Sequence, residues 1–279
     1  MEHLIRTVTL PSGVRLPFVE HGSSTGLPVV FLHGYSDSWR SYEPVLPELP
    51  DFVRAFALTL RGHGDADRPE TGYRPEDFAS DVAEFMTAVG VRQAVIVGHS
   101  MGSAVAQRFA VDHPGRILGL VLVGARTRWD THPGVLELGD YVCSSMTDPV
   151  APAFVANFQQ STLVQPMPTP YFDAVVQESL KLPARVWKAV FVECILQANH
   201  SSRLAEIDVP TLIMCGAHDE FAADEQAVLA AAIRDSRLEI YSHSGHALHW
   251  EEPGRFAADL VGFIGGLPSL ASARSTHAA

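Results

Sequence analysis

The chain has 279 residues, of which 47% are hydrophobic and 19% charged, and its formal net charge is −12. This length and balance suit one large globular core, with or without an inserted second unit. The acidic charge, with no run of Lys or Arg, argues against a nucleic-acid partner. No apolar run approaches the roughly 18 residues that cross a bilayer, so we expect no membrane partner.

The three cysteines, Cys143, Cys194 and Cys215, match neither a disulfide framework nor a zinc site. Their surroundings are apolar or small, so we expect three buried thiols in a reducing compartment. The N-terminal residues contain no cationic segment followed by an apolar one, which is the pattern of a secretory signal. We therefore expect a cytoplasmic protein, and both a monomer and a homodimer remain open.

Short apolar runs alternate with amphipathic segments along most of the chain. We expect strands over residues 29–32, 54–60, 93–97, 117–123, 211–215 and 238–241. We expect helices over residues 76–89, 101–112, 224–234 and 253–264. An antiparallel hairpin, residues 7–10 with 15–20, precedes them. This alternation predicts an α/β fold with a mostly parallel, doubly wound sheet that is covered on both faces.

One long segment, residues 125–209, interrupts the alternation. It has several prolines and short helical patterns but no clear strand. Because a structureless loop of this length is improbable in a compact domain, we expect an inserted helical lid. The predicted organisation is a first core part over 1–124, the lid over 125–209, a second core part over 210–266, and a flexible tail over 267–279.

The candidate nucleophile is Ser100, which lies in the pattern Gly-x-Ser-x-Gly over residues 98–102. The pattern ends one apolar run and begins the helix expected from Met101. Such a strand-to-helix turn exposes the serine and needs glycines, because a β-carbon there would collide with the neighbouring chain. The N-terminus of the helix stabilises developing negative charge.

A second pattern, His33-Gly34-Tyr35, follows the first core strand. An oxyanion hole takes one N–H from the residue after the nucleophile and one from a loop after an earlier strand. We expect these donors to be the backbone N–H groups of Met101 and Tyr35. Four nearby residues are candidates for substrate contact: His33, Gly34, Trp39 and His99. For His33 and His99, roles in organising the loop and in packing beneath the turn are the alternatives.

Asp219 and His246 each follow a later apolar run. The chain order Ser100, Asp219, His246 is the order of a nucleophile, acid and base in this arrangement. All three lie at the carboxyl ends of strands, where open α/β sheets place their sites. Glu220 is the alternative acid.

The histidines are many, but their spacing includes no metal-binding pattern such as His-Glu-x-x-His. We therefore expect neither a metal nor another cofactor.

Together these segments resemble the α/β-hydrolase family, specifically its capped esterase-like and haloperoxidase-like members. The matching segments are residues 33–34, 61–64, 98–102, 216–219 and 245–246. The resemblance implies an α/β-hydrolase fold in which Ser100 is the nucleophile, Asp219 orients the base, and His246 is the base. It also implies a lid formed by residues 125–209. Family members often have a proline shortly after the aspartate, and this chain does not.

The resemblance further implies a carboxylesterase-like serine hydrolase that cleaves an ester or lactone of a small to medium, mostly apolar molecule through an acyl-enzyme. Serine at position 100 disfavours epoxide hydrolases and haloalkane dehalogenases, which place aspartate there. Carbon–carbon bond hydrolysis of a ring-cleavage product and cofactor-free perhydrolase or haloperoxidase activity remain open, because they use the same triad. A catalytically weak ligand-binding module of the same fold is the alternative of a different class.

Overall fold

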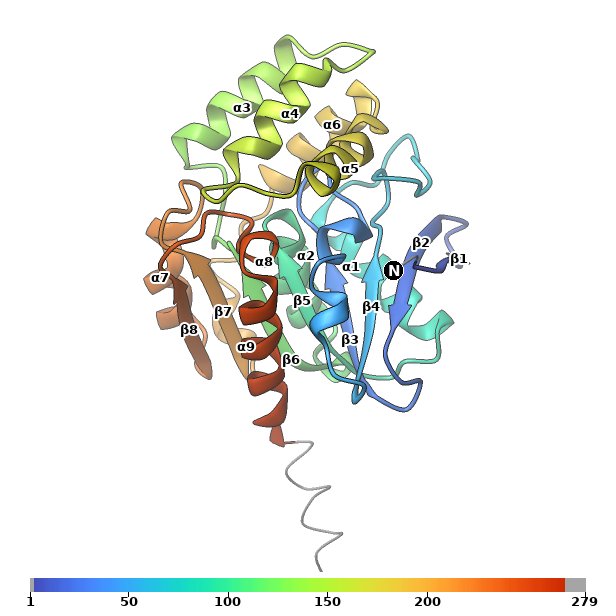
Figure 1. Ribbon diagram of the computed structural model, residues 1–279, viewed down its shortest axis with the longest axis vertical. Helices are drawn as coiled ribbons and strands as arrows, with labels where there is room; N and C mark the ends of the chain where they lie inside the picture. The colour runs from blue at the N-terminus through green and yellow to red at the C-terminus, as the bar shows by residue number, and fades with distance from the viewer. Residues whose placement is uncertain (1–2, 269–279) are drawn as a thin grey trace, which may run out of the picture.

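The computed structural model describes residues 3–268, whose strands form one eight-stranded sheet. The strands lie in the order β1-β2-β4-β3-β5-β6-β7-β8 (Figure 1). Their bounds are β1 (Ile5–Thr9), β2 (Arg15–His21), β3 (Leu27–Leu32), β4 (Val53–Leu58), β5 (Ala94–His99), β6 (Ile117–Val123), β7 (Thr211–Gly216) and β8 (Ser236–Tyr241). The pairs β1–β2 and β2–β4 are antiparallel, and the others are parallel. The prediction of a mostly parallel sheet is confirmed.

Helices cover both faces of this sheet. Those outside residues 125–209 are α1 (Pro75–Ala88), α2 (Met101–Asp112), α7 (Gln226–Ala232), α8 (Leu248–Glu251) and α9 (Pro253–Gly265). In Figure 1, α9 stands in front of the sheet, and α1 and α2 lie behind it. A sheet with helices on both faces is the doubly wound arrangement that the sequence predicts.

The alternation of side chains along the central strands explains why both faces need a cover. In β3, Val30 and Leu32 belong to one buried apolar cluster, which includes residues of α1 and α2. Val29 and Phe31 point to the opposite face and belong to a second cluster, which includes residues of α9. A strand that is apolar on both faces forms a stable part of a sheet only when helices bury both of its faces.

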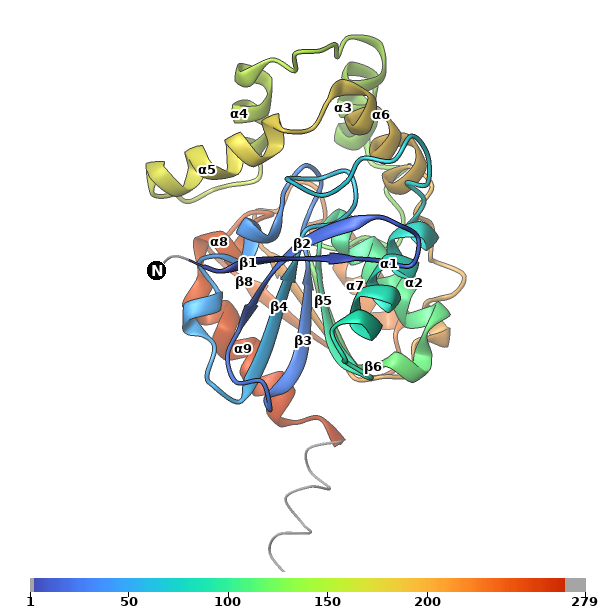
Figure 2. The same ribbon diagram turned by 90° about the vertical axis from the view of Figure 1, so that its right-hand side faces the viewer.

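A group of helices stands over the carboxyl ends of the parallel strands, as Figures 1 and 2 show from two directions. It consists of α3 (Pro133–Ser144), α4 (Pro152–Ser161), α5 (Thr169–Leu180), α6 (Ala184–Ala189) and the π-helical turn Val190–Ile195. All of these elements lie within residues 125–209, and we call them the cap helices. Their position puts them above the turns that carry Ser100, Asp219 and His246.

Two details differ from the sequence-based expectations. Leu267, which was expected to begin a flexible tail, is 1% exposed and packs in the apolar cluster beneath α9. Residues 269–279 of that predicted tail lie outside the described residues. Cys143, expected to be buried, is exposed on α3, whereas Cys194 and Cys215 are buried. The adjacent Val142 is buried in the apolar cluster, whereas Cys143 and Tyr141 face out.

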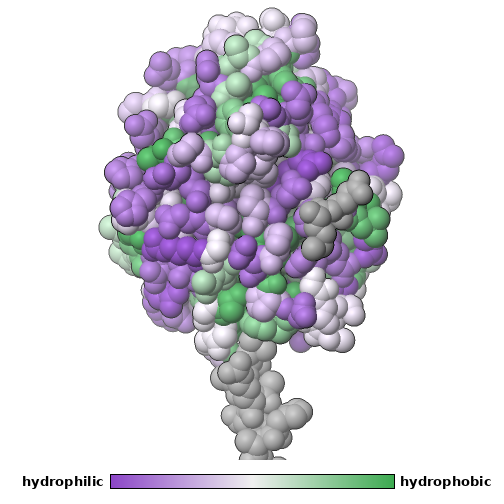
Figure 3. Space-filling model, in the orientation of Figure 1, coloured by the Kyte–Doolittle hydropathy of each residue, from purple (hydrophilic) through white to green (hydrophobic). Residues whose placement is uncertain are grey.

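The outer surface of the described chain is mixed in character. On the face drawn in Figure 3, hydrophobic side chains are scattered among hydrophilic ones. Within residues 3–268, no helix is both long enough and apolar enough to cross a membrane.

Candidate active site

Ser100 occupies the sharp turn between β5 and α2. Its backbone angles, φ 53° and ψ −117°, lie outside the regions that residues other than glycine normally adopt. A β-carbon on Gly98 would lie 2.2 Å from the carbonyl oxygen of Gly102, and one on Gly102 would lie 2.3 Å from that of Leu32. The flanking glycines therefore allow the close approach of backbone that the turn needs, and the strain at Ser100 presents its side chain at the end of the sheet.

His246 and Asp219 form a buried pair beside this turn. The Nδ1 atom of His246 lies 2.9 Å from each carboxylate oxygen of Asp219. Asp219 Oδ1 also accepts hydrogen bonds from the backbone N–H groups of Phe221 (2.9 Å) and Ala222 (3.0 Å). Burial alone would raise the pKa of Asp219, but the His246 ring and these N–H donors outweigh it, so the pKa lies below its usual value.

This pairing fixes which nitrogen of His246 can act as a base. A carboxylate only accepts hydrogen bonds, so Nδ1 carries the proton and Nε2 has the free lone pair. Ser100 and His246 line the same cavity. The Ser100 hydroxyl is not hydrogen-bonded to His246 in this structure, so the two side chains must approach each other before a proton can pass between them.

The residues whose backbone N–H groups are the expected oxyanion donors both lie at this cavity. Tyr35 and Met101 both line it, and Met101 is the first residue of α2. Neither N–H has a hydrogen-bond partner within residues 3–268. An unpaired N–H at a helix N-terminus, together with a second one from a facing loop, is the arrangement that stabilises an oxyanion.

His33 holds the loop that carries Tyr35. Its Nε2 accepts a hydrogen bond from the Leu60 N–H at 3.0 Å, and its Nδ1 lies 2.8 Å from the carbonyl oxygen of Gly34. Because Nε2 is the acceptor, Nδ1 is the protonated nitrogen and donates to that carbonyl. Burial lowers the pKa of His33 well below its usual value, and the nearby His63 ring lowers it further, so the ring stays neutral.

The cavity lies between the sheet and the cap helices and holds about 560 Å³ of space, its open mouth included. Its walls are mainly apolar and aromatic side chains from the cap and from the loops above the sheet. The apolar and aromatic residues among them are Tyr35, Met101, Trp129, Val135, Leu138, Phe158, Phe191, Ile195, Phe221 and Trp250. A pocket with this lining favours a small apolar ligand with few polar groups.

The four residues expected to contact the substrate divide into two pairs. Gly34 and His99 line the cavity. His33 and Trp39 do not, and this corrects the expectation for both. His33 is fully buried by the loop contacts described above. Trp39 begins a 3₁₀ helix (Trp39–Tyr42) and packs in the apolar cluster on the α9 face of the sheet.

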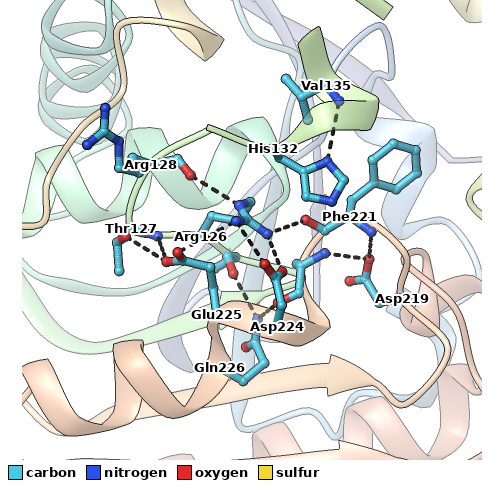
Figure 4. Close-up of polar contacts among 12 residues, drawn as sticks. Arg126, Thr127, Arg128, His132, Val135, Asp219, Phe221, Asp224, Glu225 and Gln226 are labelled. Atoms are coloured by element: carbon cyan, nitrogen blue, oxygen red, sulfur yellow. Dashed lines mark hydrogen bonds and ion pairs between the residues drawn. The ribbon is translucent and has the colours of Figure 1, made fainter. Parts of the chain in front are cut away.

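Sequence reasoning missed three polar residues near the site: Asp37, Arg126 and Gln159. Asp37 and Gln159 line the cavity, and Gln159 comes from α4 of the cap. Arg126 is 3% exposed and lies beside the loop that carries Asp219 (Figure 4). Asp37 follows the oxyanion loop by two residues and could have been suspected from that position, whereas no local pattern marks Arg126 or Gln159.

The described residues contain no group of three or more His, Cys, Asp or Glu side chains that could hold a metal ion. The arrangement around Ser100 brings a candidate nucleophile and an Asp219–His246 pair to one cavity.

Comparison with known proteins shows where the chain belongs. The model of the alpha/beta hydrolase family matches residues 29–259, which include Ser100, Asp219 and His246. The chain is a member of the alpha/beta hydrolase family. This agrees with the eight-stranded sheet and with the resemblance seen in the sequence motifs.

Several members of the alpha/beta hydrolase family are similar over nearly the whole chain. A non-heme chloroperoxidase from Streptomyces lividans is 31% identical over 92% of this chain and 99% of its own. Among solved structures, an esterase from a Rhodococcus species is 29% identical, with a TM-score of 0.82 over 94% of this chain and 99% of that one. A thermophilic esterase from Thermogutta terrifontis is 25% identical, with a TM-score of 0.83 over 94% of this chain and 98% of its own.

Proposed function

We propose that this alpha/beta hydrolase is a serine esterase that cleaves a carboxylic ester or lactone of a small to medium, mostly apolar molecule. The observation that carries the proposal is the Asp219–His246 pair on the same apolar cavity as the strained turn of Ser100. The similarity to an esterase of known structure, at 29% identity over nearly the full length of both chains, supports the same reaction class.

The first half of the reaction forms an acyl-enzyme. Ser100 Oγ attacks the ester carbonyl while His246 Nε2 takes its proton, and Asp219 stabilises the resulting imidazolium without taking the proton itself. The negative charge moves to the carbonyl oxygen, where the N–H groups of Tyr35 and Met101 hold it. As the tetrahedral intermediate collapses, the bond to the alcohol breaks and His246 returns the proton to the leaving oxygen.

The second half releases the acid. A water molecule gives a proton to His246 and attacks the acyl carbonyl, and the same two N–H groups hold the second oxyanion. Collapse breaks the bond to Ser100, which regains its proton from His246. Loss of one oxyanion donor typically lowers the rate by roughly 10²–10³-fold, so the position of the Tyr35 loop also contributes to the rate.

The test is hydrolysis of a p-nitrophenyl ester series, from acetate to decanoate, by the wild type and Ser100→Ala. The wild type should hydrolyse a short or medium ester, and the variant should lose several orders of magnitude in kcat. The chain-length optimum would report the depth of the cavity beneath the cap. Inactivity of the wild type on the whole series and on lactones would contradict the proposal and favour carbon–carbon hydrolysis or a ligand-binding module.

A second candidate, perhydrolysis, is favoured by the 31% identity to a chloroperoxidase over nearly the full length of both chains. The acyl-enzyme would be the same, and hydrogen peroxide would replace water as the attacking molecule, giving a peracid. Peracid formation from acetate and hydrogen peroxide, measured for the wild type and Ser100→Ala, distinguishes this activity from simple hydrolysis.

A further inference from the structure

Asp37 and His99 are among the polar side chains of the cavity wall that have no part in the proposed acyl transfer. Asp37 is 4% exposed and His99 is 3% exposed, yet both line the cavity that contains Ser100. Burial of polar groups without full hydrogen bonding is unfavourable, so such groups in a ligand cavity call for a partner.

The carboxyl group of Asp37 is only partly satisfied. Its Oδ1 accepts a hydrogen bond of 2.9 Å from the Gln159 amide, and its Oδ2 receives a long contact of 3.4 Å from the Ser41 hydroxyl. No cationic side chain within residues 3–268 forms an ion pair with it. Burial raises the pKa of Asp37 to about 7, even though the hydrogen bonds from Gln159 and Ser41 lower it.

His99 presents an acceptor to the same region. Its Nε2 lies 3.0 Å from the backbone carbonyl oxygen of His246, which can only accept, so Nε2 is the protonated nitrogen. Nδ1 then has a free lone pair, and this buried atom has no hydrogen-bond partner within the described chain. Burial, with the His246 ring as a second cause, lowers the pKa of His99 to about 3, so the imidazole remains neutral.

The two acceptor atoms converge beside the oxyanion loop. A β-carbon built on Gly34 would lie 2.9 Å from His99 Nδ1 and 3.2 Å from Asp37 Oδ2. Both atoms therefore lie close to Gly34, on the same side of its backbone. The following residue, Tyr35, supplies the N–H expected to hold the carbonyl oxygen of the substrate.

From this geometry we propose that Asp37 Oδ2 and His99 Nδ1 form a subsite for a hydrogen-bond donor of the substrate, a hydroxyl or an amino group close to the scissile carbonyl. The inference rests on the proposed esterase function and names its substrate class: hydroxy- or amino-substituted esters. An unsubstituted ester leaves His99 Nδ1 without a partner and Asp37 Oδ2 with only the long contact from Ser41. A site built to hydrogen-bond a substrate group discriminates strongly against an analogue that lacks it.

The test compares ethyl butyrate with ethyl 2-hydroxybutyrate, ethyl 3-hydroxybutyrate and ethyl 3-aminobutyrate as substrates of the wild type. At least one donor-bearing ester should have a kcat/KM about tenfold or more above that of ethyl butyrate. In Asp37→Leu this ratio should fall close to one. In the isosteric Asp37→Asn it should fall more for the amino ester than for the hydroxy esters, because only the ammonium group loses a charge partner. Asp140→Asn, which alters an exposed carboxyl group of α3 outside the cavity wall, should keep the wild-type ratio.

The same preference for donor-bearing esters can be measured without turnover. Calorimetry gives the Kd of each ester for Ser100→Ala. Equal kcat/KM values in the wild type and equal Kd values in Ser100→Ala would overturn the subsite while leaving the esterase proposal intact. Tighter binding of a donor-bearing ester by Ser100→Ala, with no hydrolysis of any ester by the wild type, would support the subsite and contradict the esterase proposal.

Discussion

The buried guanidinium of Arg126 binds the carboxylate of Asp224, five residues beyond Asp219 (Figure 4). The same guanidinium donates a hydrogen bond of 2.8 Å to the carbonyl oxygen of Phe221. Phe221 in turn donates its N–H to Asp219. The segment that leaves β6 toward the cap is thus bonded to the loop that holds Asp219, the proposed catalytic acid. A buried side chain therefore helps to fix the loop that carries Asp219.

Replacing Arg126 should loosen the acid loop. In Arg126→Met, the carbonyl of Phe221 and the Asp224 carboxylate lose their partner, so we expect the free energy of unfolding to fall by about 2 kcal/mol. We also expect kcat to fall, because the orientation of Asp219 is less well fixed. Urea denaturation and ester hydrolysis measure the two effects. Arg128→Met is the matched control: Arg128 pairs with Asp130 at the surface, and such pairs contribute little. Equal effects of the two variants would contradict the proposed role of Arg126.

The identity of the acid can be tested with neighbouring carboxylates. In Asp219→Asn, His246 loses the acceptor that keeps its Nδ1 protonated, so kcat should fall by roughly 10³–10⁴-fold. Glu220 is exposed, and Glu220→Gln should retain nearly full activity. Steady-state kinetics on one p-nitrophenyl ester measure both. A large loss in Glu220→Gln with a small loss in Asp219→Asn would reverse the assignment.

The buried carboxyl of Asp37 should make stability depend on pH. Because the pKa of Asp37 is raised to about 7 in the folded protein, the folded state binds its proton more tightly than the unfolded state does. The stabilisation of the folded state by protonated Asp37 is complete below the unfolded pKa near 4 and is lost as pH rises through 7. The free energy of unfolding should fall by as much as about 4 kcal/mol over this range. Asp37→Asn should therefore gain thermal stability over the wild type at pH 8, and much less at pH 4.5.

Thermal unfolding at the two pH values checks this expectation. Asp140→Asn, on an exposed position of α3, is the control and should follow the wild type at both. A difference between Asp37→Asn and the wild type that does not change with pH would show that Asp37 titrates normally.

The backbone segments at the turn that carries Ser100 lie so close together that one added methyl group should disturb them. In Gly102→Ala, the new β-carbon would meet the carbonyl oxygens of Leu32 and His33 at 2.3 and 2.6 Å. The strand leading to the oxyanion loop must then shift, so we expect a loss of stability of about 1–3 kcal/mol or more and a large loss of kcat. Gly115→Ala, where a β-carbon meets nothing within 4 Å, should change neither. Wild-type activity in Gly102→Ala would contradict this account of the turn.

The sequence predicted the core of the fold because its local and long-range signals agree. The strand expected over residues 117–123 and the helix over 101–112 have the bounds seen in β6 and α2. Each of these elements is a run of residues with the pattern typical of its structure, and Gly or Pro lies at or near each end of the run. Candidate catalytic residues could be named because each follows a strand, and parallel strands bring their carboxyl ends to one edge.

The cap could be predicted only as a region. Which of its residues reach the cavity depends on how the cap helices sit over the sheet, and no periodicity along the chain encodes that. Phe158 and Phe191 face the cavity, whereas Trp187 is buried between helices. Trp39 shows the same limit in the core, because nearness to the oxyanion loop in sequence does not decide which face of the sheet a side chain covers.

Reaction with a fluorophosphonate, followed by peptide mass analysis, tests the central claim most directly. The reaction of this reagent with a serine mimics acylation, and it needs an activated serine and an oxyanion hole. These are the two features assigned to Ser100, His246 and the Tyr35 loop. We predict one covalent adduct, on Ser100, that is absent from Ser100→Ala and formed far more slowly by His246→Ala. An unlabelled wild type, or an adduct on another residue, would contradict the claim that Ser100 is the nucleophile of this protein.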